Sequence, residues 1–173
     1  TGFNRFYFVW HHVNNGGYVM SAVVATENGW LANLSLKFSG REDKTIISHR
    51  KHQGPLVIQK PFYPEDEVCH VYLLHPPGGV VGGDQLTLDI DVNASGHALV
   101  TTPAAGKFYR SDGRVAQLKQ SLYVEAGSTL EWLPQETILF SGCEVKMQTI
   151  VQLQGDAQFV GWEILCMGRP ASG

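Results

Sequence analysis

The chain has 173 residues, of which 43% are hydrophobic and 17% charged, and its formal net charge at pH 7 is -3. This composition is typical of a globular domain with a real core and excludes a disordered chain. Phosphate binding needs clustered Lys and Arg, so the charge balance argues against nucleic acid as the main partner. No apolar run approaches the roughly 18 residues that a membrane-spanning helix needs, so we expect no membrane partner.

The first nineteen residues differ in composition from the rest. Residues 1–19 are rich in aromatic residues, His, Asn and Gly, and they lack the basic start, apolar core and cleavage site of a secretory signal. Met20 follows and is a plausible natural start. We therefore expect residues 1–19 to be a non-native or disordered extension, and residues 20–173 to form one incomplete β domain. The turn-like end after Gly168 suggests truncation at the C-terminus.

Three segments alternate between apolar and polar residues, which indicates half-buried strands. Residues 85–92 place Leu86, Leu88, Ile90 and Val92 on one face, and residues 116–124 and 144–153 repeat this pattern. Shorter strands are expected at 31–38, 56–59, 68–74, 98–102, 129–133 and 158–165.

Turn residues separate these strands at short intervals, as at Gly54-Pro55 and at 76–79. Many short strands with such punctuation predict an all-β sandwich, barrel or solenoid. Residues 103–109 have room for one helical turn at most, and no segment shows sustained helical spacing.

The cysteines are Cys69, Cys143 and Cys166. Their number is odd and no two form a Cys-x-x-Cys pair, which indicates free thiols in a reducing compartment. A structural zinc site built from cysteines is not expected.

A glycine-rich run closes the segment 70–84. A phosphate-binding loop would need a Gly-Lys-Ser/Thr ending and a following helix, and a strand follows instead. Two interpretations stay open: a tight loop between strands, or a loop that also forms a partner or metal surface.

Acids, a thiol and imidazoles gather just before and within this segment. Such side chains together suit borderline cations such as nickel or zinc. Alternate residues of a strand point to opposite faces, so we do not expect one compact site from all of them. The alternatives are a solvated acidic turn and a transient site along a channel. The residues are Glu65, Asp66, Glu67, Cys69 and His70, with His75 and Asp84 nearby.

Enzyme signatures are missing from the sequence. A cupin-type metal site needs two His one residue apart, whereas His49 and His52 are three apart and His70 and His75 are five apart. No serine lies in a Gly-x-Ser-x-Gly context. We interpret residues 49–52 as an exposed basic loop or strand end.

Lys107, Phe108, Tyr109 and Arg110 combine two cations with two aromatic rings. Tyr and Arg are favoured anchors at protein interfaces, so this group is a candidate partner-binding surface. The alternative is a packed aromatic pair beside two solvated charges.

Five motifs in order resemble the urease accessory protein family UreD, called UreH in some organisms. The resemblance covers residues 29–173 and is specific because the order of all five is kept. The motifs lie at 54–65, 69–84, 101–111, 130–136 and 161–170, and include His75-Pro76-Pro77-Gly78-Gly79 and Gly168-Arg169-Pro170.

This resemblance implies a β-helical, solenoid-like scaffold of short strands with little helix. It also implies a non-catalytic, cytoplasmic protein that contacts apo-urease and recruits a UreF-type protein, which docks a UreG-type GTPase. Nickel would pass through an internal tunnel without a tightly bound cofactor. The alternative is a bridging module that never contacts nickel. The tunnel lining would fall on Glu65, Asp84, Glu136 and Glu163, with Cys69 and His70 nearby. Family members continue beyond the Gly-Arg-Pro motif.

Overall fold

The computed structural model describes residues 6–12 and 29–168, and all regular structure in these ranges is β. The first strands are β1 (Phe6–His12), β2 (Leu31–Arg41), β3 (Lys44–Gln53), β4 (Val57–Ile58) and β5 (Cys69–Leu74). The next are β6 (Gln85–Asn93), β7 (His97–Thr101), β8 (Gly106–Phe108), β9 (Ala116–Val124) and β10 (Thr129–Leu133). The last are β11 (Thr137–Leu139), β12 (Val145–Leu153), β13 (Gln158–Gly161) and β14 (Leu165–Met167).

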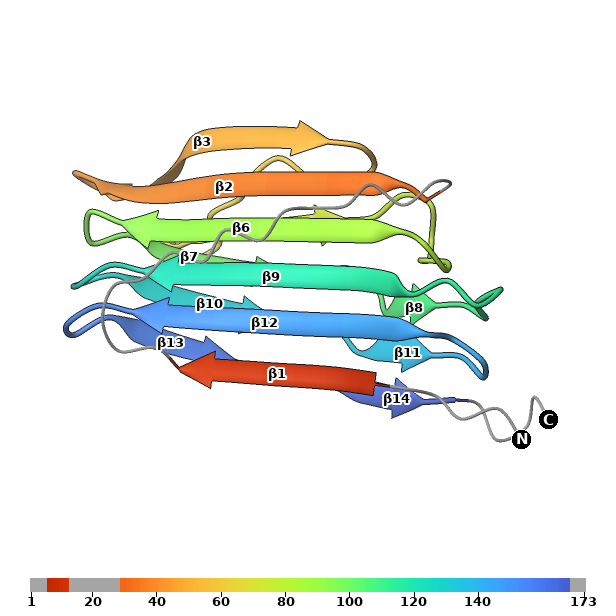
Figure 1. Cartoon of the computed structure of the whole chain (residues 1–173). Helices are drawn as coiled ribbons and strands as arrows, with labels where there is room; N and C mark the ends of the chain where they lie inside the picture. The colour runs from red at the N-terminus through yellow and green to blue at the C-terminus, as the bar shows by residue number, and fades with distance from the viewer. Residues whose placement is uncertain (1–5, 13–28, 169–173) are drawn as a thin grey trace.

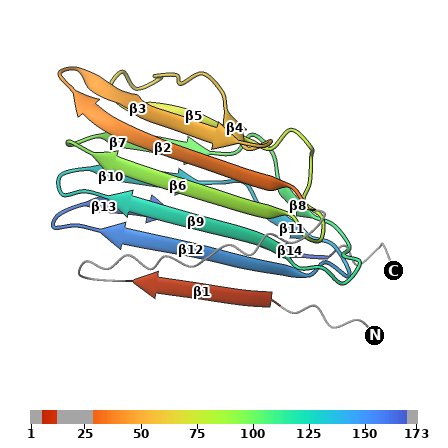
Figure 2. The same cartoon turned by 45° about the horizontal axis from the view of Figure 1, so that its top comes forward.

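The chain winds as a β-solenoid of about three turns, and each turn adds one strand to each of three sheets. The turns are β6-β7-β8, β9-β10-β11 and β12-β13-β14, and equivalent strands pair in parallel. The six-stranded sheet has the order β1-β12-β9-β6-β2-β3, and the five-stranded sheet has the order β13-β10-β7-β5-β4. The short strands β8, β11 and β14 form the third sheet at one end (Figures 1 and 2).

Apolar alternation places matching side chains of successive turns beside one another. Leu86 pairs with Leu118, which pairs with Met147, and Ile90, Leu122 and Val151 form a second row. Side chains of a strand alternate between the two faces of the sheet. In parallel strands that pair in register, an inward residue therefore lies beside inward residues of the neighbouring strands. The interior is therefore built of rows that run across the turns.

The N-terminal end departs from the regular winding. Strand β2 pairs in parallel with β6 and antiparallel with β3, with a register shift at Lys37/Phe38. Strand β5 pairs in parallel with β7 and antiparallel with β4. Strand β3 therefore forms one edge of the six-stranded sheet.

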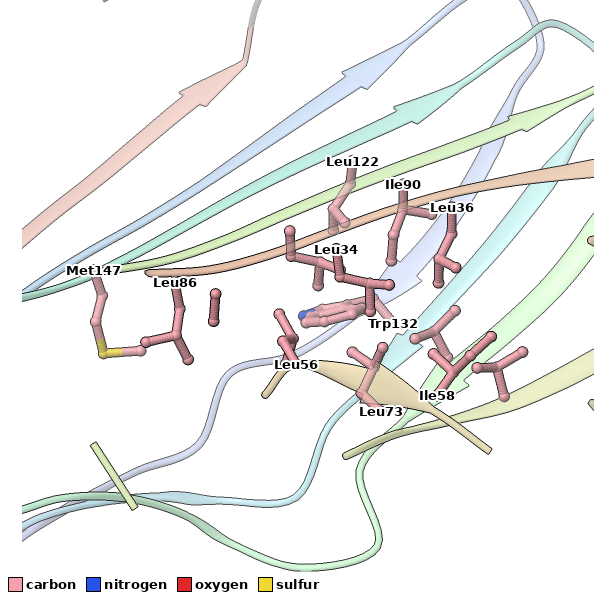
Figure 3. Packing of buried hydrophobic residues seen from close by; sticks show 14 of the residues in the cluster. Leu34, Leu36, Leu56, Ile58, Leu73, Leu86, Ile90, Leu122, Trp132 and Met147 are labelled. Atoms are coloured by element: carbon pink, nitrogen blue, oxygen red, sulfur yellow. The ribbon is translucent and has the colours of Figure 1, made fainter. Parts of the chain in front are cut away.

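The hydrophobic core lies between the two large sheets. Leu34, Leu36, Ile90 and Leu122 from the six-stranded sheet are almost wholly buried. Figure 3 shows them opposite Leu73 and Trp132 of the other sheet, with Leu56 beside them. Burial of apolar surface contributes roughly 25 cal/mol for each Å², so these side chains stabilise the packing of the two sheets.

The sequence-based expectation of a β-solenoid with little helix is confirmed. Residues 103–109, which had room for one helical turn at most, form none; they contain β8, because Gly106 N donates to Glu136 O (2.9 Å) and the segment joins the third sheet. One local expectation was wrong. The strand expected at 158–165 is split into β13 and β14, because the chain turns a corner between two sheets.

Within the N-terminal extension, residues 6–12 form β1 and pair in parallel with β12. The rest of residues 1–19 lies outside the described residues, as does the expected C-terminal cut beyond Gly168. The domain boundary expected at Met20 also lies outside them, so this division of the chain stays a prediction.

Candidate functional site

A cavity of about 500 Å³ lies inside the solenoid, between the start of the six-stranded sheet and the corner that carries the third sheet. Its volume falls within the ~300–1,000 Å³ range of small-molecule sites. Its walls come from every turn: Leu86 and Leu88 from β6, Leu118 from β9, Met147 from β12, and Trp132 from β10. The cavity therefore runs along the solenoid across successive turns.

Three polar side chains, two of which line the cavity, are joined in one cluster. Gln120 and Thr149 are buried at inward positions of β9 and β12, where neighbouring strands carry Leu88 and Leu34. Thr149 Oγ1 lies 3.3 Å from Gln120 Oε1 and makes a short hydrogen bond with Glu163 Oε1. Gln120, Thr149 and Glu163 form a polar row beside the mainly apolar wall of the cavity, which Lys107 also lines.

The polar row offers oxygen atoms to a cation. A hydroxyl carries a single proton, and Gln120 Oε1 and Glu163 Oε1 are both acceptors, so Thr149 donates to one of these two oxygens at a time. Gln120 and Glu163 line the cavity itself. A carboxylate and an amide oxygen in an apolar surrounding attract a positive charge, because the local dielectric is low.

His75 and Trp132 supply further polar groups on the cavity wall. Burial lowers the pKa of the His75 imidazole below its ordinary value, and the nearby Asp84 carboxylate partly opposes this effect. Neutral His75 is therefore favoured, which is the form that binds metals. Trp132 Nε1 is buried and has no hydrogen-bond partner in the described structure.

The candidate ligands at residues 65–70 are separated by strand β5. Cys69 faces the core and is fully buried, whereas His70 lies on the other face beneath the ring of Phe62. Glu65 is exposed, and its Oε1 lies 3.9 Å from His70 Nε2. Glu65 and His70 therefore come together, whereas Cys69 and His70 point to opposite faces, as the alternation of the strand predicts.

Cys69 is held in a state that disfavours metal binding. Burial raises the pKa of the Cys69 thiol, an effect that a hydrogen bond with Tyr63 partly offsets. Burial also raises the pKa of Tyr63 to about 12, with the Cys69 contact adding to it. The thiolate is the metal ligand, so a buried neutral thiol is poorly suited to that role.

Asp84 and Glu136 lie in loops of different turns of the solenoid. Asp84 is buried in the loop before β6, where its carboxylate accepts hydrogen bonds from Trp30 N and Val81 N, both 2.9 Å. Glu136 lies between β10 and β11. Across residues 29–168, no group of three or more His, Cys, Asp or Glu side chains could hold a metal ion. The predicted metal set is therefore not one centre.

The candidate partner-binding group at 107–110 has both buried and exposed members. Phe108 is buried in β8, and Lys107 is partly exposed and lines the cavity. Tyr109 is exposed and stacks on Phe140, with ring centroids 5.1 Å apart, and Arg110 is exposed as well. Tyr109 and Arg110 are the members that a partner could reach.

Comparison with known proteins assigns the family. A profile described as UreD urease accessory protein matches residues 31–173. The chain belongs to the UreD family. It is 51% identical over 142 residues to the urease accessory protein UreD of Citrobacter koseri, covering 82% of this chain and 50% of that protein. It is 52% identical over 145 residues to the UreD of Pseudomonas entomophila, covering 84% and 52%.

A third relative gives the same result. The UreD of Alcanivorax borkumensis is 51% identical over 156 residues, covering 88% of this chain and 53% of that protein. This UreD-family chain thus spans about half the length of the relatives it matches. The resemblance found in the five sequence motifs is confirmed. In the part of the chain that the structure describes, no helix is long and apolar enough to cross a membrane.

Sequence reasoning named Glu163 but missed its partners in this UreD-family chain. Gln120 was passed over, and Thr149 was interpreted only as part of an alternating strand. The signal was present: both are polar residues at positions whose alternation faces inward. A buried polar residue in an apolar row needs a hydrogen-bond partner, which is the observation that points to Glu163.

Proposed function

We propose that this UreD-family chain is a non-catalytic scaffold in urease maturation. It guides nickel from a complex of a UreF-type protein and a UreG-type GTPase toward apo-urease, in the cytoplasm. Membership of a family of urease accessory proteins supports this role. Nickel is then a passing cargo, and no tightly bound cofactor is part of the proposal.

The observation that carries the proposal is the polar row at the cavity wall. Glu163, Gln120 and the neighbouring Thr149 give nickel weak oxygen contacts, and His75 gives a neutral imidazole on the same cavity wall. Borderline divalent cations accept both ligand types. No cluster of three ligands holds the ion among the described residues, so the ion exchanges quickly, as a conduit requires.

A second candidate is a bridging module that joins a UreF-type protein to urease without contacting nickel. Two observations favour it: the cavity walls are mainly apolar, and Tyr109 and Arg110 stand exposed at one corner. In this version the cavity is only a packing gap between sheets, and the exposed corner carries the function.

The experiment reconstitutes urease activation from apo-urease, a UreF-type protein, a UreG-type GTPase and nickel. Glu163→Gln keeps the shape and the hydrogen bond to Thr149 but removes the charge. Glu42→Gln makes the same change at an exposed hairpin position and is the matched control. Nickel guidance predicts reduced urease activation for Glu163→Gln alone, with unchanged retention of both partners in a pull-down.

Full activation by Glu163→Gln would contradict the passage of nickel along the polar row. If Tyr109→Ala and Arg110→Ala then abolish partner retention, the bridging module is the correct account. If neither partner is retained by the unchanged chain, both versions fail.

A further inference from the structure

Strand β3 forms an open edge of the six-stranded sheet. It pairs antiparallel with β2 on one side, and the sheet order places no described strand beyond it (Figure 1). Near its start, Thr45 N donates to Glu67 O (2.9 Å) across the outer side. The later residues, 48–53, are all exposed. An open edge presents unpaired main-chain groups, which are a template for another strand.

This open edge carries a concentrated positive charge. His49, Arg50, Lys51 and His52 occupy four consecutive positions. Among the described residues Arg50 and Lys51 form no ion pair, whereas Lys37 on the neighbouring strand is paired with Asp91 (3.1 Å). Successive residues point to opposite faces, so the charge reaches both faces of the edge.

Nearby acids leave the basic segment largely uncompensated. Glu42, Asp43 and Glu67 lie at the other end of β3, next to Thr45. Asp89 lines a groove of about 230 Å³ together with Lys51 and His52. Asp91, on the same strand as Asp89, is paired with Lys37.

The positive charge of Arg50 and Lys51 determines which kind of strand can bind at this edge. Two copies of this chain joined edge to edge at β3 would bring like charges together, which disfavours that pairing. An extended segment with adjacent acidic residues places a carboxylate toward Arg50 on one face and toward Lys51 on the other. Main-chain hydrogen bonds then supply affinity and the charges supply selectivity.

We propose that residues 48–53 of β3 bind an extended acidic segment of a partner protein as an added strand of the six-stranded sheet. This inference is independent of nickel passage, because the edge lies on the outside of the solenoid and its residues do not line the cavity.

The test measures fluorescence anisotropy of a labelled eight-residue peptide with two adjacent Glu flanked by Val and Thr, titrated with the 173-residue chain. Arg50→Glu/Lys51→Glu should weaken binding about tenfold or more, the change expected for losing close, partly desolvated charge pairs. Lys119→Glu/Lys146→Glu on the outward face of β9 and β12 is the matched control and should leave binding within about threefold. If circular dichroism shows that the charge-reversed variant is misfolded, the neutral variant Arg50→Gln/Lys51→Gln is used in its place.

Two modified peptides test the mode of binding. The same peptide with Gln for Glu should bind about tenfold more weakly, and one N-methylated at alternate residues should also lose binding because it cannot pair main chain to main chain. Equal binding of either peptide would overturn the proposal. So would tighter binding of single-stranded DNA through the same two residues, or no binding of the acidic peptide at millimolar concentration.

Discussion

Replacing Thr149 with Val removes the hydroxyl that links Gln120 and Glu163 while nearly preserving the volume of the side chain. The hydroxyl donates its one proton to either Gln120 Oε1 or Glu163 Oε1, so the variant removes a hydrogen bond next to the buried Gln120 amide in a low-dielectric space. Leaving a buried polar group unsatisfied costs about 1–3 kcal/mol. We expect the free energy of unfolding to fall by that amount.

Urea titration followed by circular dichroism measures this change. With a denaturant slope of about 2 kcal/mol/M, the transition midpoint should fall by about 0.5–1.5 M. Thr87→Val is the matched control, because Thr87 lies at an outward position of β6 and should shift the free energy by less than about 0.5 kcal/mol.

A triple variant separates stability from function. Gln120→Leu/Thr149→Val/Glu163→Leu replaces the whole polar row by apolar side chains of similar volume, and should unfold within about 1 kcal/mol of the unchanged chain. The same variant should activate urease poorly if the row guides nickel. An unchanged midpoint for Thr149→Val would refute the reasoning, because it would mean that the hydroxyl has no role inside the cavity.

Three further outcomes are expected. Leu122→Ala should lower the free energy of unfolding by about 2–5 kcal/mol, since the Leu122 side chain is almost wholly buried. A loss below about 1 kcal/mol would contradict the packing of Leu122 in the core. Gly40→Ala should lower the thermal midpoint, because a Cβ there would clash with the main-chain oxygen of Ala94 in the loop after β6; an unchanged midpoint would show that this loop can shift without loss of stability. Iodoacetamide at pH 8 should label exposed Cys166, whereas Cys69 and Cys143, whose pKa values burial raises, should react only after unfolding; peptide mass mapping would expose any equal labelling.

The strands that could be predicted from the sequence are those with one buried and one exposed face. Ala116–Val124 and Thr129–Leu133 were predicted with the observed bounds, and 85–92 and 144–153 differ from β6 and β12 by one residue. Alternation is strong in these segments because each strand separates the core from solvent.

The strands that were missed lack that pattern. Strand β3 carries charges at consecutive positions, so residues 49–52 were interpreted as a loop or strand end, although they are exposed as expected. Strands β8 and β11 have three residues each, too few to show a period. Their pairing comes from stacking of the turns, which depends on residues far away in the sequence.

The candidate site could also be predicted only in part. Alternation alone predicted that Cys69 and His70 would separate, and they do. The inward direction of Glu163 could not be predicted, because it follows a strand that ends at a corner between sheets. Likewise, one of the two hydrogen bonds that hold Asp84 in its loop comes from Trp30, which is distant in the sequence.

The parallel stacking of turns has a consequence for synthesis. Each finished turn of about 30 residues exposes strand edges in the register that the next turn needs, so it serves as a template. Because the strand order along the solenoid from β6 to β14 follows the order of the chain, these turns can assemble as they leave the ribosome. Strands β1 and β2 are exceptions, because their parallel partners β12 and β6 are made only after several intervening strands. Pairing of these two strands therefore has to wait for later parts of the chain.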